Sequence, residues 1–305
     1  MAGYRLANYQ GASGPRAGII IGASVFDAAS LTNHASYATT LDVLADWPRA
    51  TDLIQTAMDA GPKGGWPLAD THLRAPLLWP SAIYCAGANY RDHAAEMAER
   101  LGRPKDPDPK ASGGQPWHFL KAPRSIADPG ASIEATGYSK KLDWEVELAA
   151  VIGRPAKNVS VERALDYVAG YTCANDLSAR DLSKRKEASE KSPFHFDWTG
   201  QKSFDGACPL GPWIVPAGDI PDPQDLFLKL WVNDVPKQDS NTAEMIFTLA
   251  DQIAHLSRGM TLHPGDVILT GTPAGVGTGR GEFLNAGDVV KIEIERIGTL
   301  TNTIV

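Results

Sequence analysis

The chain has 305 residues, of which 43% are hydrophobic and 21% are charged, as in an ordinary globular protein. Its net charge of −7 argues against a nucleic-acid partner, because phosphate binding needs a basic face. Three widely spaced cysteines without a C-x-x-C pair predict packed thiols in a reducing compartment. No apolar run reaches the ~20 residues of a membrane span, and no signal-peptide pattern opens the chain. We therefore expect a cytoplasmic protein with no membrane partner.

The first 78 residues predict a small α+β unit, and residues 79–305 predict a larger domain. In the first unit, two strands form a hairpin around a turn rich in Gly and Pro, and an interrupted helix follows. These elements are the strands Tyr4 to Tyr9 and Ala17 to Phe26, and a helix over 40–60 with a break at Pro48.

In the larger domain, short apolar strands alternate with turn residues, which predicts an α+β fold that is predominantly β. The expected strands are Ala82 to Cys85, Leu148 to Ile152, Val168 to Ala174, Leu226 to Val232, Asp266 to Thr270 and Val289 to Ile294. The expected helices are Tyr90 to Leu101, Val161 to Leu165 with Ser160 as its N-cap, and Thr242 to Ser257. Residues Gly102 to Gln115, rich in Pro and Gly, predict a flexible loop.

The stretch Lys141 to Ile152 predicts a strand in which Glu145 and Glu147 point to one face. The residues after Glu147 are apolar on both faces, as in a strand that is buried on both sides. Two carboxylates buried together repel, and a hard cation between them would relieve that repulsion. Asp176 ends the next predicted strand, and three carboxylates without His or Cys favour Mg²⁺ or Mn²⁺. On spacing alone, the alternative is the solvated face of a strand.

His93 and Glu96 are three residues apart in a predicted helix, so they lie one above the other on one face. A carboxylate beside an imidazole fixes its tautomer and raises its basicity, which suits a general base acting on water. The alternative is a surface ion pair. The strand end before this helix runs through Gly87, and residues at such positions often line a site.

Three other features have two interpretations on the residues alone. The glycine-rich loop 270–277 follows a strand but lacks the G-K-[ST] of a phosphate loop. It either brings backbone close to a small ligand or makes a tight connection. Lys202 and Arg180 would ordinarily be solvated side chains.

Five motifs follow one another along the chain from about residue 80 to its end. They are C-A-G-A-N-Y-R-D-H at 85–93, D-W-E-V-E-L at 143–148, N-D-L-S-A-R-D at 175–181, K-S-F-D at 202–205, and G-D-V-I-L-T-G-T-P-A-G-V-G at 265–277. This ordered set resembles the fumarylacetoacetate hydrolase family, in its bacterial acylpyruvase and oxaloacetate decarboxylase-like branch.

The resemblance implies a mixed β-sandwich or roll that assembles as a homodimer and holds Mg²⁺ or Mn²⁺. Glu145, Glu147 and Asp176 match the metal ligands of the family. His93 and Glu96 match a catalytic dyad on a short helix that acts as a mobile lid.

The resemblance also assigns residues around the ligand. Lys202 matches a catalytic lysine that contacts the substrate, Arg180 matches an arginine near the ligand, and Thr272 and Gly271 match substrate-binding positions. The chain departs from the family in two ways. A fourth carboxylate ligand has no equivalent, and the Gln that often follows the arginine by three is Ser183 here. An extended segment, Lys184 to Asp197, then precedes Trp198.

The implied activity is metal-dependent hydrolysis of a C–C bond in a small diketo acid of the acylpyruvate or fumarylpyruvate type, through a metal-bound enolate, in aromatic or carboxylic acid catabolism. In this scheme His93 draws a proton from water, and Lys202 stabilises negative charge on the 2-oxo acid substrate. The same enolate would serve a decarboxylase or isomerase of a 2-oxo dicarboxylic acid, of the oxaloacetate or 2-hydroxyhepta-2,4-diene-1,7-dioate type. A non-catalytic binding protein would be expected to have lost a metal ligand or a lid residue, and this chain keeps them all.

Overall fold

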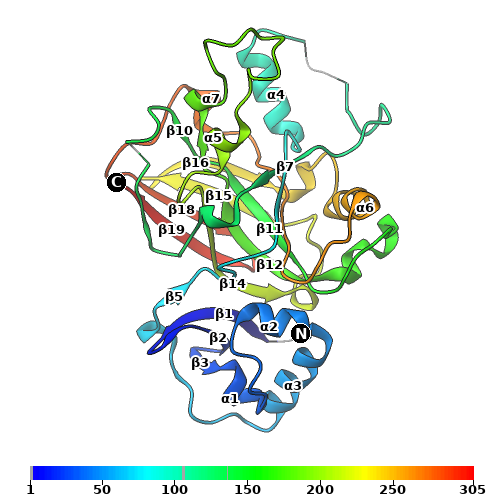
Figure 1. The fold of residues 1–305 in the computed structure, drawn as a ribbon, viewed down its shortest axis with the longest axis vertical. Coiled ribbons are helices and arrows are strands. Elements are labelled where there is room, and N and C mark those ends of the chain that lie inside the picture. Colours follow the sequence, from blue (N-terminus) through cyan, green and yellow to red (C-terminus); the bar gives the residue numbers. More distant parts are fainter. Residues whose placement is uncertain (1–2, 105–106, 136) are drawn as a thin grey trace.

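The computed structural model describes residues 3–104, 107–135 and 137–305. Strands predominate and form two main sheets, with the helices arranged around them (Figure 1). This confirms the predicted α+β fold that is predominantly β. The two sheets pack face to face and remain open at their edges.

The N-terminal part begins with an antiparallel meander. β1 (Tyr4–Gly11) pairs with β2 (Gly14–Ile21), which pairs with β3 (Ser24–Asp27). The single strand predicted over 17–26 is wrong, because a turn at Gly22 with a φ of 58° divides it into β2 and β3. The other elements of this part are α1 (Ala28–Thr32), α2 (Thr40–Ala45), α3 (Trp47–Asp59), β4 (Trp66–Pro67), the 3₁₀ turn η1 (Leu68–Asp70) and β5 (Leu73–Arg74). Pro48 lies in the first turn of α3, where its missing N–H costs little.

The larger sheet continues through the rest of the chain. From β1 its path runs through β14 (Cys208–Pro216), β12 (Val168–Asn175), β11 (Val146–Ile152), β17 (Val267–Leu269), β6 (Ile83–Ala86) and β7 (His118–Lys121), with β8 (Ile126–Ala127) beside β14. The smaller sheet has the order β16 (Val235–Asn241), β15 (Phe227–Val232), β18 (Val289–Ile294), β19 (Gly298–Ile304) and β9 (Ser132–Ile133). A separate pair joins β10 (Leu142–Asp143) to β13 (Ser178–Ala179).

The six strands predicted in this part are confirmed to within one or two residues. Strands β7, β14, β16 and β19 were not predicted. β14 contains prolines and a glycine, β16 is mostly polar, and β19 alternates Thr and Asn with apolar residues. Each of these strands is stabilised by pairing with its neighbouring strands rather than by a strong preference of its own residues for strand structure.

The helices are confirmed in part. α4 (Arg91–Arg100) matches the predicted helix, whereas the segment after Ser160 is a 3₁₀ helix, η3 (Val161–Tyr167), and the Ser160 side chain makes no capping hydrogen bond. The remaining short elements are η2 (Pro123–Ser125), η4 (Arg180–Leu182), α5 (Trp198–Lys202), η5 (Ala217–Asp219) and α7 (Gly277–Arg280).

The helix predicted from Thr242 starts too early. α6 (Leu249–Gly259) has Thr248 as its N-cap, and the Thr248 side chain forms a capping box with Asp251. The preceding residues form the 3₁₀ turn η6 (Thr242–Glu244) and then an extended segment.

One core joins the N-terminal part to the larger sheet. β1 pairs with β14 through Leu6 and Ile214, and buried side chains of both parts, such as Val43 and Ala149, belong to one cluster. In Figure 1 the N-terminal part lies below the central sheets, against β14. Residues 78 and 79 fall in the connection between β5 and β6. A domain boundary at this point stays a prediction.

The second core lies between the two sheets. Leu148 and Ile152 of β11 belong to one buried cluster with Leu228, Ile292 and Leu300 of the smaller sheet. Ala149 and Val151 of β11 pack into the first core instead. This confirms that the strand carrying Glu147 is buried on both faces.

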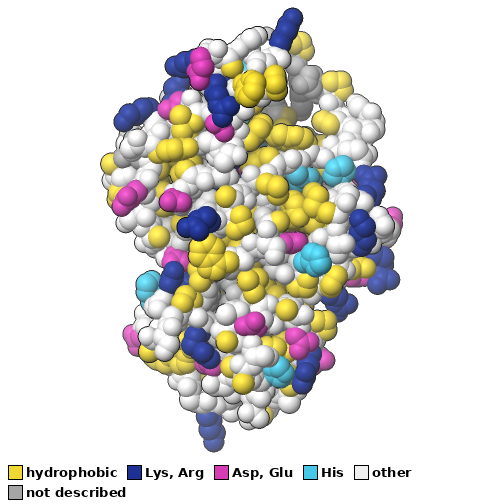
Figure 2. Space-filling model, viewed as in Figure 1, with side chains coloured by type: hydrophobic (Ala, Val, Ile, Leu, Met, Phe, Trp, Pro, Cys, Tyr) yellow, Lys and Arg dark blue, Asp and Glu magenta, His cyan; other side chains and the backbone are white. Residues whose placement is uncertain are grey.

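The outer surface mixes charges. On the face seen in Figure 2, basic and acidic side chains lie among one another, and hydrophobic side chains gather across the middle. Among the described residues, no helix combines the length and apolar character that crossing a membrane requires.

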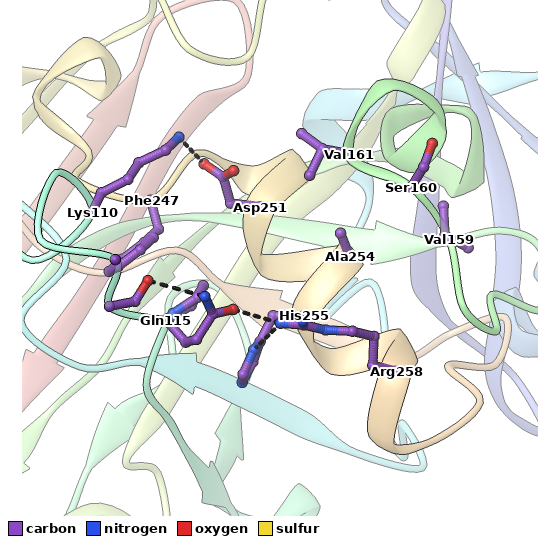
Figure 3. Close-up of a pocket in the computed structure, with 13 residues that line it drawn as sticks. Lys110, Gln115, Val159, Ser160, Val161, Phe247, Asp251, Ala254, His255 and Arg258 are labelled. Carbon is purple, nitrogen blue, oxygen red and sulfur yellow. Dashed lines mark hydrogen bonds and ion pairs between the residues drawn. The ribbon is translucent and has the colours of Figure 1, made fainter.

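The loop that leads into β7 is fixed against α6. As predicted, its described residues between 102 and 115 contain no helix or strand, while residues 105 and 106 lie outside the described part. Lys110 pairs with Asp251 at 2.5 Å, and Arg258 donates to Gln115 at 2.5 Å. These contacts border a cavity of about 400 Å³ beside α6 (Figure 3).

His118 follows this loop and packs against α6. Its Nε2 is 3.4 Å from Gln252 Oε1, whose own amide nitrogen donates to Phe247, so the ring donates from Nε2. The buried Nδ1 has no partner among the described residues. A second proton there would be an N–H without an acceptor, and burial lowers the His118 pKa from 6.5 to about 4.

His118 is therefore predicted to make the fold sensitive to acid. Because its pKa is depressed in the folded state, the unfolded chain binds more protons between pH 6.5 and about 4. The unfolding free energy that depends on neutral His118 is therefore fully present above pH 6.5 and is lost as the pH falls towards 4. His118→Gln should flatten the loss of unfolding free energy between about pH 7 and about pH 5 in urea titrations, whereas the exposed His72→Gln should not. An equal pH dependence in the two variants would contradict this account.

Candidate active site

Neighbouring strands bring the three predicted metal ligands together. Glu147 lies on β11, Glu145 precedes that strand, and Asp176 follows β12. Because β11 and β12 are antiparallel, with Val146 opposite Asn175, the start of one strand meets the end of the other. The three residues are at most 5% exposed, and one oxygen from each lies within 4.8 Å of the other two. The structure thus brings the three predicted side chains together, although the strand predicted over Lys141 to Ile152 is divided at Trp144 and Glu145 into β10 and β11.

Two buried lysines lie against the triad. The Nζ of Lys202, at the end of α5, is 2.7 Å from Glu145 Oε2 and 2.6 Å from Asp176 Oδ2. The Nζ of Lys121, at the end of β7, is 2.5 Å from Asp176 Oδ1. Burial by itself lowers the Lys202 pKa, but the adjoining carboxylates raise it above its usual value. Lys202 is therefore a charged ammonium at the base of the site.

Arg180 connects the triad to the glycine-rich loop. Its Nε is 2.8 Å from Asp143 Oδ2, and its Nη2 donates to Glu145. Asp143 is fully buried and also accepts from the N–H groups of Gly277 at 2.6 Å and Thr278 at 3.0 Å. Arg180 thus reaches the site already bound to two carboxylates, and Asp143 fixes the loop after β17.

Glu147 is the member of the triad that no described side-chain cation contacts. Its Oε2 accepts from the N–H of Gly271 at 2.7 Å. Burial and repulsion from Asp176 and Glu145 raise the Glu147 pKa well above its usual value. By contrast, although burial would raise it, Lys202 and Arg180 lower the Glu145 pKa to about 2. The all-carboxylate donor set and the uncompensated charge at Glu147 both fit a hard divalent cation.

His93 of the dyad on α4 lines the same cavity as the triad. His93 Nδ1 is 3.4 Å from Glu96 Oε2, and the N–H of Gly275 donates to both oxygens of Glu96 at 3.0 and 3.1 Å. Burial would raise the Glu96 pKa, but these hydrogen bonds outweigh it and lower the pKa. Asp92 accepts from Ser240 at 2.6 Å, which also holds α4 against the body of the protein. The predicted mobility of this helix stays a prediction.

Thr272 presents its hydroxyl to the cavity. Its Oγ1 accepts from Gln238 Nε2 at 2.9 Å, while Gln238 Oε1 accepts from the N–H of Val146 at 2.9 Å. The Thr272 hydroxyl hydrogen is therefore left to donate to a ligand. Gly271 donates its N–H to Glu147, which lines the cavity. Its predicted role in binding the substrate stays a prediction.

These groups enclose a cavity of about 200 Å³. Its walls are formed by His93, Glu145, Glu147, Asp176, Arg180, Lys202 and Thr272, together with Ala86, Gly87, Ala88, Trp117, Phe119, Trp198 and Gln201. The cavity beside α6 is larger, but its lysine and arginine are paired and it holds no carboxylate triad (Figure 3). The smaller cavity is therefore the candidate active site.

Asn89 joins the helix of the dyad to the loops around the site. Its Nδ2 donates to the carbonyl oxygens of Thr270 at 2.8 Å and Phe247 at 3.0 Å, and its Oδ1 accepts from the N–H of Phe247 at 2.9 Å. The residue before it, Ala88, has a φ of 49°, a conformation that few non-glycine residues adopt. Asn89 thus fixes the turn from β6 into α4.

The sequence prediction missed several residues that support the site. Lys121 carried a usable signal, since it is two residues after Phe119 in a short apolar strand and shares its face. The contacts of Asn89, Asp143 and Gln238 each span 30 residues or more, so local sequence patterns carried no signal for them.

The comparisons with known proteins agree with this geometry. Residues 82–305 match the family model described as the C-terminal domain of fumarylacetoacetate (FAA) hydrolase. The chain belongs to the fumarylacetoacetate hydrolase family. It is 43% identical over 235 residues to oxaloacetate tautomerase fahd2 of Xenopus laevis, covering 76% of this chain and 68% of that protein. It is 40% identical to oxaloacetate tautomerase YisK of Bacillus subtilis, covering 78% and 74% of the two chains.

Solved structures of the family share the whole fold. Fumarylacetoacetate hydrolase from Exiguobacterium antarcticum superposes with a TM-score of 0.77 at 32% identity, over 99% of each chain. Maleylpyruvate hydrolase from Sphingobium sp. SYK-6, in complex with manganese(II) and pyruvate, gives a TM-score of 0.75 at 31% identity, over 99% of this chain and 98% of that one. These similarities confirm the family predicted from the five motifs.

Removal of the Glu147 charge is predicted to weaken cation binding and, at the same time, to stabilise the fold. Outer-shell partners of metal ligands are worth about 10–100-fold in affinity, so loss of a ligand in Glu147→Gln should weaken Mn²⁺ binding by at least that much. In chelator, the same variant should melt above the unmodified protein, because the buried repulsion is gone. Calorimetric titration and thermal unfolding measure the two effects, with the exposed Glu162→Gln as control. Unchanged Mn²⁺ affinity would show that the triad holds no cation.

Asn89 is predicted to be important for stability. Asn89→Ala leaves buried groups of Phe247 and Thr270 without this partner, at a cost of about 1–3 kcal/mol in unfolding free energy. Urea unfolding measures the loss, and the exposed Asn285→Ala should show none. A loss no larger than that of the control would mean that other groups fix this turn.

Proposed function

We propose that this protein is a Mg²⁺- or Mn²⁺-dependent hydrolase that cleaves a C–C bond in a small diketo acid of the acylpyruvate type. The observation that carries the proposal is that His93, with Glu96 at its Nδ1, lines the same cavity as the carboxylate triad. Charge supports it too. With every group ionised, the carboxylates Asp143, Glu145, Glu147 and Asp176 outnumber the cations Lys121, Arg180 and Lys202 by one.

The triad would hold the cation, which supplies Lewis acidity toward the carboxylate and keto oxygens of a 2-oxo acid. A divalent ion would change the net charge of these groups from one negative to one positive, which suits the binding of a substrate carboxylate. Thr272 donates its free hydroxyl hydrogen to a substrate oxygen. Lys202 stabilises negative charge that develops on the departing fragment.

The dyad supplies the proton transfer. Glu96 is ionised and anchored by Gly275, so it holds the Nδ1 side of the His93 ring and leaves Nε2 available to water in the cavity. His93 accepts a proton from that water, which attacks the distal carbonyl, and then returns the proton to the carbon released by C–C cleavage. Maleylpyruvate hydrolase, a solved structure of the same fold, supports hydrolysis on such a framework.

A second candidate is keto–enol tautomerisation or decarboxylation of a 2-oxo dicarboxylic acid. The relatives named oxaloacetate tautomerase, at about two fifths identity, favour it. In that reaction His93 would move a proton on carbon, and no water would attack. We further propose that the protein works in the cytoplasm as a homodimer.

His93→Ala distinguishes the two candidates. Loss of a general base costs ~10²-fold or more, so hydrolysis of acetylpyruvate should fall by that factor. Mn²⁺ affinity should not change, because His93 is not part of the triad. Oxaloacetate decarboxylation, if present, should fall less, since the cation by itself stabilises the enolate.

The exposed His72→Ala is the control for this experiment. Pyruvate release, followed by a coupled assay with Mg²⁺ or Mn²⁺, measures hydrolysis. Undiminished hydrolysis in His93→Ala would refute the water-activation role. Equal losses of hydrolysis and decarboxylation would assign His93 to proton transfer on carbon and favour the second candidate.

A further inference from the structure

Three aromatic rings form the wall of the cavity away from the triad. The centroids of Trp117 and Trp198 are 5.1 Å apart, those of Phe119 and Trp198 are 5.3 Å apart, and those of Trp117 and Phe119 are 5.8 Å apart. Trp117 is 48% exposed and Trp198 is 39% exposed, so both rings keep free surface. Lys202 Nζ lies 5.1 Å from the centre of the Phe119 ring, which makes this aromatic wall continuous with the catalytic groups.

The position of Trp117 is fixed by backbone and by the preceding loop. A Cβ at Gly87 would lie 1.5 Å from Trp117 Cζ3, so the absence of a side chain at Gly87 makes room for the ring. The N–H of Gly87 also donates to the carbonyl oxygen of Trp117 at 3.0 Å. Two residues earlier, Gln115 accepts from Arg258 of α6 (Figure 3).

Trp198 is positioned by the extended segment 184–197. The ends of this segment close on each other, because the N–H of Asp197 donates to the carbonyl oxygen of Ser183 at 3.0 Å. The Asp197 side chain then caps α5 by accepting from the N–H of Gly200 at 2.8 Å. The segment therefore returns the chain to the point where Trp198 meets the cavity.

Gln201 adds one neutral polar group. It is 6% exposed and lines the cavity, and its side-chain amide has no hydrogen-bond partner in the described part of the chain. The amide atoms keep some accessible surface, so a ligand in the cavity can reach them. Gln201 thus offers a donor and an acceptor to a substrate, without charge.

The cations that line the cavity are already bound to carboxylates, although Lys202 Nζ also lies 5.1 Å from the centre of the Phe119 ring. Arg180 and Lys202 line it, but both contact carboxylates of the triad or Asp143. Next to the aromatic wall, the described residues place no further Lys or Arg on the cavity. A second carboxylate on the far end of a substrate would therefore lose water without gaining a counter-ion.

We infer that Trp117, Phe119, Trp198 and Gln201 form a neutral subsite that selects an uncharged, planar acyl group. The inference rests on the proposed function and specifies its substrate class as acylpyruvates with an aryl or alkyl substituent. The aromatic wall stacks on the substituent, and the Gln201 amide hydrogen-bonds an uncharged oxygen of the acyl group. Substrates with a second carboxylate, such as fumarylpyruvate and oxaloacetate, are disfavoured.

The test compares kcat/KM for three probes with the unmodified protein and Mn²⁺ or Mg²⁺. Benzoylpyruvate should exceed fumarylpyruvate by ~10-fold or more, on the scale of one aromatic contact and the apolar area that it buries. Trp117→Ala and Trp198→Ala should each lower the ratio of kcat/KM for benzoylpyruvate to kcat/KM for acetylpyruvate by ~10-fold, mainly through the KM for benzoylpyruvate. Trp79→Ala, an exposed tryptophan outside this cavity, is the control.

The outcomes separate this inference from the proposed function. Turnover of acetylpyruvate with fumarylpyruvate preferred over benzoylpyruvate would overturn the neutral subsite and leave the hydrolase intact. Equal losses for acetylpyruvate and benzoylpyruvate in both tryptophan variants would also overturn it. Failure of every acylpyruvate to react with either cation would overturn the hydrolase and this inference together. The ratio of kcat/KM for benzoylpyruvate to kcat/KM for fumarylpyruvate is measured on the unmodified protein, so it does not depend on the folding of any variant.

Discussion

The buried charge cluster at the junction of β11 and β12 determines how the rest of the site is built. Glu145, Glu147 and Asp176 lie within a few ångströms of one another in a nearly dry environment, where unpaired charge is costly. Lys121 and Lys202 neutralise part of that charge, and each comes from a different element. Consequently β7 and α5 must end at the triad for the cluster to be stable, which brings Phe119 and Trp198 to the same cavity.

The same electrostatic constraint explains why the glycine-rich loop lies where it does. Backbone N–H groups of Gly271, Gly275 and Gly277 each donate to a different carboxylate: one of the triad, Glu96 of the dyad, and Asp143. A loop that directs three of its amides at anions needs close backbone approach, which glycine permits. The loop therefore connects the carboxylate triad to the helix of the His93–Glu96 dyad.

The sequence could predict the features that depend on residues close to one another along the chain, but not those that depend on distant residues. The alternation of Glu145 and Glu147, the i,i+3 spacing of His93 and Glu96, and the apolar strands are local patterns, and the structure confirms them. The predicted helix from Thr242 failed because a capping box at Thr248 competes with an apolar periodicity that continues through it. Strands such as β16 and β14 are defined by partners far along the chain.

The loop before β7 contributes to both cavities near that strand: it binds α6, and it carries Trp117 to the cavity with the triad. The loop before β7 is bound to α6 through Gln115 and Arg258, and it delivers Trp117 to the catalytic cavity two residues later. His118 then points back to α6, because alternate residues of a strand face opposite sides. A substitution on α6 can therefore reach the aromatic wall through a few contacts, without touching the triad. The triad lies at β11 and β12 and the dyad lies on α4, so the aromatic residues of β7 and α5 can vary provided that Lys121 and Lys202 are kept. One framework can in this way accommodate both hydrolases and tautomerases.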